Sequence, residues 1–415
     1  MAKAKRMNEV AGEEKTVDNK TIVKSIRNAL NKSDDEKVTW DLSKDDSPTF
    51  VKEFISTGST LLDYIIANRR GGGVPCGKIT EIQGEEASGK SLVCAHIIAN
   101  TQRKGGIAVY LDTENASNPD FMRRIGVDLD RLIYIQPGTV EKAFETIEDV
   151  IKVLRAKSST VPVTILWDSV GNTPPQAEIE GDYDPNSRMG LGAKAMAKGL
   201  RKITEMLGRE QITMVFTQPL KYAMGGSPYA DPFTTPYGKA LPYHSSVRVR
   251  LTSSTKLKDK GGNIYGLKTN GRIIKSRLGP GHRSIKFEIH FDHGIDDEGS
   301  WFDVLHEAGL IEKRNGWCYI DVHDHATLGS VPEGKITDGV SVRVYEKTGR
   351  KELQFRELGF GETLRGFPAL RDWCLDRFDD LLVIKYDDKR PVREGVEIPN
   401  DEAEIKEALP TQENP

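Results

Sequence analysis

The sequence predicts an α/β fold with a twisted, mostly parallel β-sheet, and three observations support this prediction. First, short apolar segments alternate with longer amphipathic ones over about residues 54–291, as in a wound α/β core. Second, a glycine-rich loop stands between a strand-like and a helix-like segment. Third, the strand-like segments are short continuous apolar runs, a pattern typical of parallel strands that are buried on both faces.

The glycine-rich loop, residues 84–91, reads Gly-Glu-Glu-Ala-Ser-Gly-Lys-Ser. This is the G-x-x-x-x-G-K-[ST] pattern in the strand–loop–helix setting of a phosphate-binding loop. In such a loop the backbone N–H groups and the helix N-terminus surround a triphosphate. Lys90 would reach the β- and γ-phosphates, and the Ser91 hydroxyl would hold Mg²⁺. We therefore expect binding of ATP with Mg²⁺, rather than a glycine turn that only caps a helix. The loop residues assigned to the cofactor are Gly84, Glu86, Ala87, Ser88, Gly89, Lys90 and Ser91.

Length and composition indicate an ordinary soluble protein. The 415 residues suffice for one large α/β core with one or two smaller modules. No apolar run approaches the ~18 residues of a membrane helix, and the charged N-terminus lacks the apolar region of a secretory signal. The four cysteines have no C-x-x-C spacing, which argues against a cysteine-based zinc site and a disulfide framework. We expect a cytoplasmic protein without a membrane partner. Because the net charge is −3, binding to nucleic acid would require local basic surfaces.

Periodicity and turn residues predict the individual elements. After the strand at residues 78–83 and the helix at 92–99, further strands are predicted at 107–111, 132–135, 163–167 and 212–216. Helices are predicted between them at 119–124, 140–156 and 187–208. Beyond Tyr237 the pattern changes to alternating strands at 245–251, 264–275 and 284–291.

The predicted organisation has four parts. Residues 1–50 form an extension in which Asp18 caps a short helix with Ile22, Ile26 and Leu30 on one stripe. Such a helix cannot bury its stripe alone, so we expect it to dock on the body or on a neighbouring subunit. Residues 51–298 form the core, 299–393 a small α+β C-terminal domain, and 394–415 an acidic flexible tail.

Polar side chains follow three of the predicted strands. Asp168 ends one strand and would act on Mg²⁺, although an aspartate in this position can also be a helix cap. Glu114 follows a second strand and is the candidate that orients or deprotonates water, with a solvated loop acid as the alternative. Gln218 follows a third strand, where its amide could sense the γ-phosphate. The loop that it begins is long and rich in glycine, proline and aromatic residues, which is typical of a functional loop.

Together these motifs resemble the RecA family of DNA recombinases, which includes bacterial RecA and phage UvsX-like proteins. Similarity runs from about residue 50 to about residue 320, with the motifs in family order. The resemblance implies a RecA-type P-loop ATPase core. The matching segments are Ile55-Ser56-Thr57-Gly58-Ser59, the phosphate loop with Glu86, Leu111-Asp112-Thr113-Glu114-Asn115-Ala116, Trp167-Asp168-Ser169-Val170, Ala177-Glu178-Ile179-Glu180-Gly181, Met189-Gly190-Leu191-Gly192-Ala193 and Ser246-Val247-Arg248.

The resemblance assigns roles to individual residues. Glu114 matches the catalytic glutamate of the family, Gln218 its γ-phosphate sensor and Phe121 an aromatic residue beside adenine. Lys275 and Arg277 match cations that reach the ATP site of a neighbouring subunit. Residues two apart on a strand project from one face, which supports this pair independently, although a plain charged sheet surface is the alternative. The expected catalytic residues are Lys90, Glu114, Gln218, Lys275 and Arg277. The metal would be held by Ser91 and Asp168, and the nucleotide site is completed by Asn118 and Ser169.

The resemblance also implies two DNA-binding loops, at residues 180–189 and 219–237. The helix after the first loop carries Lys194, Lys198 and Arg201 on one basic stripe, which could contact phosphates or simply face solvent. Aromatic and methionine side chains of the second loop could stack on bases without reading their sequence. The expected DNA-binding residues are Arg188, Met189, Lys194, Lys198, Arg201, Lys221, Tyr222, Met224, Gly225, Gly226, Tyr229 and Phe233.

The chain also departs from the family pattern. Pro242 occupies a position where a lysine usually helps to couple neighbouring subunits, and proline cannot supply that charge. Asn118 replaces an acid near the adenine, and the second loop is about two residues longer than usual.

The resemblance implies ATP-dependent helical filaments on single-stranded DNA, followed by homologous pairing and strand exchange. The expected partners are single-stranded DNA, homologous duplex DNA and further copies of the chain, with single-strand-binding and mediator proteins as possible additions, in a bacterial cell or a phage-infected host. Two alternatives remain open from the sequence: a RecA-fold ring motor or regulatory ATPase without strand exchange, and an ATP-binding filament scaffold that has lost turnover.

Overall fold

The structure is a computed structural model. It describes residues 18–31, 37–42, 47–115, 117–157, 161–180, 190–222, 231–322, 328, 333–337, 340–344, 351–357 and 359–385. The chain divides into two units, Met1–Val383 and Ile384–Pro415, and the helices and strands of the described residues belong to the first.

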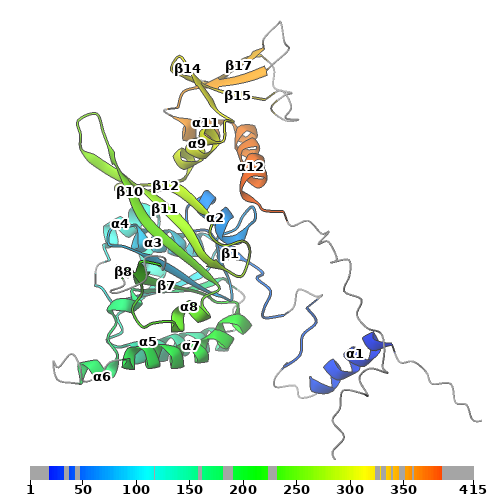
Figure 1. The fold of residues 1–415 in the computed structure, drawn as a ribbon, viewed down its shortest axis with the longest axis vertical. Coiled ribbons are helices and arrows are strands. Elements are labelled where there is room, and N and C mark those ends of the chain that lie inside the picture. Colours follow the sequence, from blue (N-terminus) through cyan, green and yellow to red (C-terminus); the bar gives the residue numbers. More distant parts are fainter. Residues whose placement is uncertain are drawn as a thin grey trace, which may run out of the picture. The chain divides into compact units, whose positions relative to one another are not determined.

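A nine-stranded mixed sheet forms the centre of this unit (Figure 1). Its strands are β3 (Ile79–Gly84), β4 (Ile107–Asp112), β5 (Leu132–Ile135), β6 (Val163–Asp168), β7 (Thr213–Pro219), β10 (Val247–Lys258), β11 (Ile264–Ser276), β12 (Ser284–His290) and β13 (Gly294–Asp296). The order is β13-β12-β11-β10-β3-β7-β6-β4-β5. All neighbours from β10 to β5 pair in parallel, whereas β11, β12 and β13 are antiparallel additions. The predicted mostly parallel α/β sheet is confirmed.

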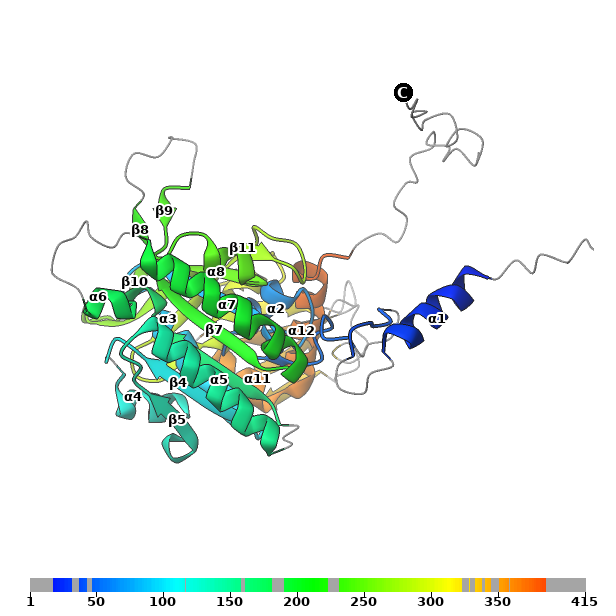
Figure 2. The ribbon, with the colours of Figure 1, turned by 90° about the horizontal axis from the view of Figure 1, so that it is seen from below.

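Helices cover both faces of the sheet (Figures 1 and 2). One face packs against α2 (Thr60–Ala67), α3 (Lys90–Arg103) and α4 (Pro119–Ile125), and the other against α5 (Val140–Ala156), α7 (Leu191–Glu210) and α8 (Ala240–His244). Successive strand residues point to opposite faces. In β6, Leu166 joins the first apolar cluster, while Ile165 and Trp167 join the second. The continuous apolar run of this strand is therefore explained by burial on both faces.

The predicted strand at residues 132–135 was expected to be buried on both faces, and this expectation is wrong. The strand β5 is the last of the sheet, with only β4 as a neighbour. Its central residues Ile133 and Tyr134 are 43% and 44% exposed. An edge strand has one open side, and a run of four apolar residues does not reveal whether it lies at an edge or in the centre.

The hairpin of β10 and β11 is longer than the sequence predicts. Pairing continues to Lys258 and Ile264, across residues 252–258 that lack apolar alternation. The turn is closed by Asp259, whose carboxylate accepts hydrogen bonds from the N–H groups of Gly261 and Asn263 at 2.8 and 2.9 Å. Backbone pairing through this turn extends the strands beyond the sheet core, although their side chains there are mostly exposed. Apolar patterning alone could not show this.

The N-terminal helix α1 (Asn19–Leu30) is present as predicted, and the Asp18 side chain caps it by accepting a hydrogen bond from the Lys20 N–H. Its apolar stripe is exposed in the described chain, with Ile26 and Leu30 at 52% and 53%. Docking of this stripe on another surface stays a prediction.

The segment after β13 forms a second sheet with its own apolar cluster. Its elements are α9 (Asp297–Glu307), β14 (Glu312–Arg314), β15 (Trp317–Asp321), β16 (Gly334–Thr337), β17 (Val340–Val344), β18 (Lys351–Phe355), α11 (Phe360–Gly366) and α12 (Pro368–Leu382). The sheet is antiparallel, in the order β14-β15-β18-β17-β16. Tyr64 of α2 joins this cluster, and its hydroxyl donates to Asp379 at 2.9 Å. The division of the chain at residue 298 stays a prediction.

Several small elements and single features complete the description. They are β1 (Phe54–Ile55), β2 (Val74–Pro75), η1 (Leu129–Arg131), η2 (Val170–Asn172), α6 (Gln176–Ile179), β8 (Lys221–Tyr222) and β9 (Phe233–Thr234). The four cysteines, Cys76, Cys94, Cys318 and Cys374, are buried free thiols. Within the described residues, no helix combines the length and the apolar character needed to cross a membrane.

The contact between α5 and α7 generates a stability prediction. A Cβ atom on Gly199 of α7 would lie 2.2 Å from the Phe144 ring of α5. Gly199→Ala should therefore lower the free energy of unfolding by about 1–3 kcal/mol through overpacking, although alanine favours a helix by about 1 kcal/mol over glycine. Urea denaturation measures the change. Gly138→Ala is the control, because nothing lies within 4 Å of its Cβ position. Equal effects of the two substitutions would contradict the packing argument.

Candidate nucleotide-binding site and DNA-facing loops

Four neighbouring parallel strands end at one edge of the sheet. β3 ends at Gly84, β4 at Asp112, β6 at Asp168 and β7 at Pro219. The register aligns Asp112 with Asp168, and Gly84 with Pro219. Ligands of open α/β sheets bind at this carboxyl edge. The structure thus brings together the three strand ends that the sequence singled out and the start of the phosphate loop.

The phosphate loop requires glycine at both ends. A Cβ atom on Gly84 would lie 2.3 Å from Oγ of Ser88 and 2.7 Å from the carbonyl oxygen of Leu251. Gly89 has a φ of +94°, and a Cβ atom there would lie 2.4 Å from Cδ1 of Ile289. Only glycine accommodates this backbone conformation and these approaches without strain. The spacing of the motif is therefore explained by the packing of the loop against β10 and β12.

Lys90 begins α3 directly after this loop. Its ammonium donates hydrogen bonds to the carbonyl oxygens of Gly84 and Glu85, at 3.0 and 2.7 Å. Burial lowers the pKa of Lys90, and the negative charges of Asp168 and Glu114 oppose this shift. Ser91, which follows Lys90, hydrogen-bonds to Asp168, and Ser169, which follows Asp168, donates to Glu114, so the lysine and both carboxylates share one site.

Asp168 is buried, with 3% of its surface exposed. The hydroxyl of Thr217 donates to its Oδ1, and the hydroxyl of Tyr110 donates to its Oδ2 at 3.1 Å. Burial raises the pKa of Asp168, while hydrogen bonds from Thr217 and Ser91 lower it. The predicted metal pair therefore lies together as a hydroxyl and a carboxylate, which are oxygen ligands of the kind that Mg²⁺ prefers.

Glu114 lies in the loop that follows β4. Its Oε1 accepts hydrogen bonds from the Ser169 hydroxyl at 2.5 Å and from the Asn172 amide at 2.8 Å. The loop itself is fixed by Asp112, whose Oδ1 accepts hydrogen bonds from the N–H groups of Glu114 and Asn115 at 3.0 and 2.9 Å. Two donors hold one carboxylate oxygen of Glu114. Its second oxygen can act on a water molecule.

A cavity of about 120 Å³ opens beside the start of α3. Its wall includes Ser91, Asn118 and Phe121, together with apolar residues of α3. Asn118 caps α4, because its side-chain oxygen accepts hydrogen bonds from the N–H groups of Asp120 and Phe121 at 2.9 and 3.1 Å. The three predicted cofactor residues therefore line one cavity next to the phosphate loop.

Gln218 is fully buried at the end of β7. Its Nε2 donates weakly to the carbonyl oxygen of Pro236 at 3.4 Å, but its Oε1 has no hydrogen-bond partner among the described residues. On the neighbouring strand, Gln83 pairs with Gln218 in register, and its Nε2 likewise lacks a partner there. Buried polar atoms without partners are uncommon in folded proteins, so this strand end can satisfy further hydrogen bonds when a ligand or a rearranged loop supplies them.

The predicted cations Lys275 and Arg277 are not brought to the phosphate loop of the same chain. Lys275 donates to the carbonyl oxygens of Pro242 and Tyr243, at 2.7 and 3.2 Å. Arg277 donates to the carbonyl oxygen of Tyr243 at 3.1 Å. Both cations therefore lie at the C-terminal end of α8, where carbonyl oxygens favour positive charge. Their action on a neighbouring subunit stays a prediction.

The residues that flank the two expected DNA loops contact each other. A Cβ atom on Gly192, at the start of α7, would lie 2.1 Å from the ring of Tyr237, the last residue of the second loop. The Tyr237 hydroxyl also donates to the carbonyl oxygen of Thr173. Residues 181–189 and 223–230 lie outside the described residues, and with them Arg188, Met189, Met224, Gly225, Gly226 and Tyr229.

The described ends of the second loop connect it to the phosphate loop. The rings of Tyr222 and Phe233 pack with centroids 5.0 Å apart, and the Tyr222 hydroxyl donates to Oε1 of Glu85 at 3.3 Å. Lys221 precedes Tyr222 on β8 and is exposed. The Arg250 guanidinium lies 5.0 Å from the Phe233 ring centroid. Two aromatic residues predicted to stack on bases thus adjoin the phosphate loop.

The helix after the first loop is amphipathic as predicted. Its apolar face, Met196, Leu200, Ile203 and Leu207, is buried. Its basic stripe, Lys194, Lys198 and Arg201, is exposed. The helix begins at Leu191 rather than at residue 187, after Gly190 in a left-handed conformation.

Comparison with known proteins gives a direct result. The family described as the RecA N-terminal domain matches residues 24–296. The chain belongs to the RecA family. "Protein RecA" of Desulforapulum autotrophicum is 38% identical over 267 residues, which cover 64% of this chain and 74% of that protein. "Protein RecA" of Rubrobacter xylanophilus is 35% identical over 316 residues, which cover 73% of this chain and 88% of that protein.

One departure from the RecA pattern can now be described in structural terms. Pro242 lies within α8, where its side chain offers no charge but its carbonyl oxygen accepts the hydrogen bond from Lys275. Tyr243, the next residue, is 70% exposed. A backbone carbonyl and an exposed aromatic ring therefore occupy the region in which the resemblance implies a lysine.

Sequence patterns missed several residues of this RecA-family site. Thr217 and Tyr110 hold Asp168, and Asn172 holds Glu114. These contacts join different strands and loops, so no local motif contains them. Thr217 stands next to Gln218, and a hydroxyl beside a predicted sensor at a strand end could have been noted.

His96, in the middle of α3, generates a prediction about pH. Its Nε2 accepts a hydrogen bond from the Ile295 N–H at 3.0 Å, and burial together with Arg103 and His293 lowers the pKa of His96 to about 4. An unfolded histidine has a pKa of about 6.5. Between these values the unfolded chain binds a proton that the folded chain does not. Above pH 6.5 the neutral His96 therefore does not reduce the free energy of unfolding. As the pH falls from 6.5 towards 4, the free energy of unfolding decreases.

His96→Gln should flatten this dependence by up to about 1 kcal/mol per pH unit, measured by urea denaturation from pH 7 to pH 4.5. Burial raises the pKa of Asp63 to about 7, which makes the free energy of unfolding increase as the pH falls. Because wild type and variant both contain Asp63, the difference between their pH dependences reports His96 alone. Identical slopes for wild type and variant would refute the assignment.

Proposed function

We propose that this chain is a DNA-dependent ATPase that forms ATP-bound helical filaments on single-stranded DNA. In these filaments it promotes homologous pairing and strand exchange in recombination and repair. The observation that carries this proposal is the convergence of Lys90, Asp168 and Glu114 at one sheet edge in a chain of the RecA family. Its relatives carry the name Protein RecA, which favours this function over a ring motor or an inactive scaffold.

The residues around the sheet edge fit ATP with Mg²⁺. The N–H groups of the glycine loop and the Lys90 ammonium would hold the phosphates, and Ser91 with Asp168 would hold the metal. The cavity lined by Asn118 and Phe121 would receive the base. When bound, Mg²⁺ neutralises charge on the phosphate oxygens.

Glu114 is the proposed base that positions and deprotonates the attacking water. Its first carboxylate oxygen is held by Ser169 and Asn172, so its second oxygen keeps a fixed direction. A base of this kind must be within hydrogen-bond reach of the water. Gln218 lies at the end of β7, from which β6 separates the strand before Glu114, and its Oε1 has no partner among the described residues, which suits a sensor of the γ-phosphate.

Lys275 and Arg277 are proposed to complete the site of a neighbouring subunit. Their position at the end of α8, away from the groups that act on Lys90, favours action in trans over action in the same chain. Two cations directed at a γ-phosphate stabilise the charge of phosphoryl transfer, as an arginine finger does. ATP turnover should then depend on subunit contact within the filament.

DNA binding is proposed to use the basic stripe of α7 and the two loops beside it. Phosphate contacts by Lys194, Lys198 and Arg201 would position the strand without reading its sequence. Tyr222 and Phe233 would stack on bases. The hydrogen bond from Tyr222 to Glu85 gives DNA at the second loop a direct route to the phosphate loop. The same surfaces would serve single-stranded DNA and the homologous duplex, with single-strand-binding and mediator proteins as further partners.

Phosphate release tests the catalytic assignment. The rate of ATP hydrolysis should rise at least tenfold when single-stranded DNA is added, because DNA aligns the subunits. Glu114→Gln should bind ATP and assemble, but hydrolyse it at least a hundredfold more slowly, since it lacks the base. Lys90→Ala should fail to bind ATP.

Electron microscopy of the same samples separates the alternatives. Helical filaments of the wild type with ATP and DNA, persistent filaments of the Glu114 variant and none of the Lys90 variant are expected. Closed rings, or an ATPase rate that ignores DNA, would rule out the recombinase.

Salt dependence tests the DNA surface. The logarithm of the affinity for single-stranded DNA should fall linearly with the logarithm of the salt concentration. Lys194→Ala and Lys198→Ala should each reduce this slope by about 0.7 to 1 unit, as expected for one lost phosphate contact. Fluorescence anisotropy with labelled oligonucleotides measures it. Lys286→Ala on β12 is the matched control and should leave the slope unchanged. An unchanged slope in both α7 variants would mean that the stripe only faces solvent.

A further inference from the structure

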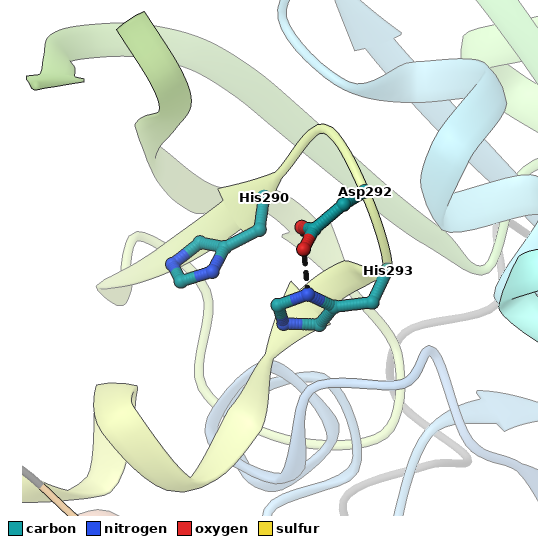
Figure 3. Close-up of side chains that lie close together, drawn as sticks. All are labelled: His290, Asp292 and His293. Atoms are coloured by element: carbon teal, nitrogen blue, oxygen red, sulfur yellow. Dashed lines mark ion pairs between the residues drawn. The ribbon is translucent and has the colours of Figure 1, made fainter. Parts of the chain in front are cut away.

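The turn between β12 and β13 carries a cluster of imidazole and carboxylate groups that the proposed ATPase does not use. His290, Asp292 and His293 form it, and one ligand atom of each lies within 4.8 Å of the others (Figure 3). Glu288 and Asp296 form a second set with His290 that satisfies the same distance. Two histidines and three carboxylates therefore lie in this turn or on the strands beside it, in two sets that share His290.

Carboxylates orient both imidazole rings. Oδ1 of Asp292 lies 2.7 Å from Nδ1 of His293, the ion pair drawn in Figure 3. Oε2 of Glu288 lies 3.5 Å from Nε2 of His290. Each imidazole has a second ring nitrogen besides the one that faces its carboxylate, and the ring centroids are 4.7 Å apart. A carboxylate on the second ring nitrogen is the arrangement that surrounds metal-bound histidines in proteins.

The backbone of the turn is held in place. The Phe291 N–H donates to the carbonyl oxygen of Tyr265 at 2.9 Å, and the Ile295 N–H donates to His96 at 3.0 Å. Gly294 has a φ of +91°, and a Cβ atom there would lie 2.4 Å from Nε2 of His96. The ligands are therefore mounted on a fixed frame, which reduces the ordering that binding requires.

We propose that this turn binds one divalent transition-metal cation of the zinc class, through His290, His293 and at least one carboxylate. Two imidazoles favour such ions over Mg²⁺, which prefers oxygen ligands only. Zn–N distances are about 2.0–2.1 Å. Rotation of the exposed side chains can bring their ligand atoms to this distance from one ion. His293 and Asp292 are 52% and 78% exposed, so these rotations meet little resistance. The site depends neither on nucleotide nor on DNA.

Titration calorimetry of the full chain with ZnCl₂, without nucleotide or Mg²⁺, tests this inference. We expect one Zn²⁺ per chain, and at least tenfold weaker binding in His290→Gln and in His293→Gln. Asp292→Asn, on an exposed side chain that cannot disturb the core, should weaken binding about tenfold by releasing the His293 ring. Circular dichroism spectra check that the variants fold.

Other histidines supply the controls. His282 is exposed and has a φ of +63°, which asparagine tolerates, so His282→Asn removes an imidazole at no structural cost. His323 and His325 lie outside the described residues, and replacing both by glutamine checks whether they contribute. Both controls should bind Zn²⁺ as the wild type does. The proposal would be overturned if the His290, His293 and Asp292 variants bound Zn²⁺ as the wild type does, or if only the controls lost binding. Displacement of Zn²⁺ by millimolar Mg²⁺ would also overturn it.

Discussion

The buried carboxylate of Asp168 is the constraint on which the rest of the site depends. A charge inside an α/β core is costly unless hydrogen-bond donors surround it. The donors come from separate elements, Tyr110 on β4, Thr217 on β7 and Ser91 on α3. They meet only if β4, β6 and β7 pair in the observed register and α3 begins directly at their edge. The same register brings the strand ends that precede Glu114 and carry Gln218 to the sheet edge at which Lys90 begins α3, so the surroundings of the buried acid and the proposed phosphate site depend on one arrangement.

Sequence patterns were sufficient for most of the α/β core. Each buried parallel strand is a short apolar run next to a turn signal, and the phosphate loop has a spacing that few other structures share. The exposure of the edge strand β5 and the length of the β10–β11 hairpin were harder to predict from the sequence. Whether a strand is buried depends on which strands lie beside it, and its own sequence does not show this. Strand pairing beyond the core depends on backbone hydrogen bonds, which the pattern of polar side chains does not predict.

The candidate site was predictable only in part. Lys90, Asp168, Glu114 and Gln218 stand at strand ends, where position along the chain already indicates position in space. The groups that hold them come from other strands, and only the folded chain shows these contacts. For Lys275 and Arg277, the relevant surroundings would belong to another molecule. Within one chain, their side chains contact the carbonyl oxygens of α8, and these contacts give their position but not their proposed function.

The contact between Gly192 and Tyr237 has a consequence for how such proteins can diverge. Because the two residues anchor the ends of the two expected DNA loops against each other, the separation of these ends is fixed by one ring packed on one glycine. Insertions within either loop then leave the anchors in place and do not disturb the sheet edge. The length of either loop can therefore change without altering the contact between Gly192 and Tyr237, and the two additional residues expected in the second loop fit this arrangement.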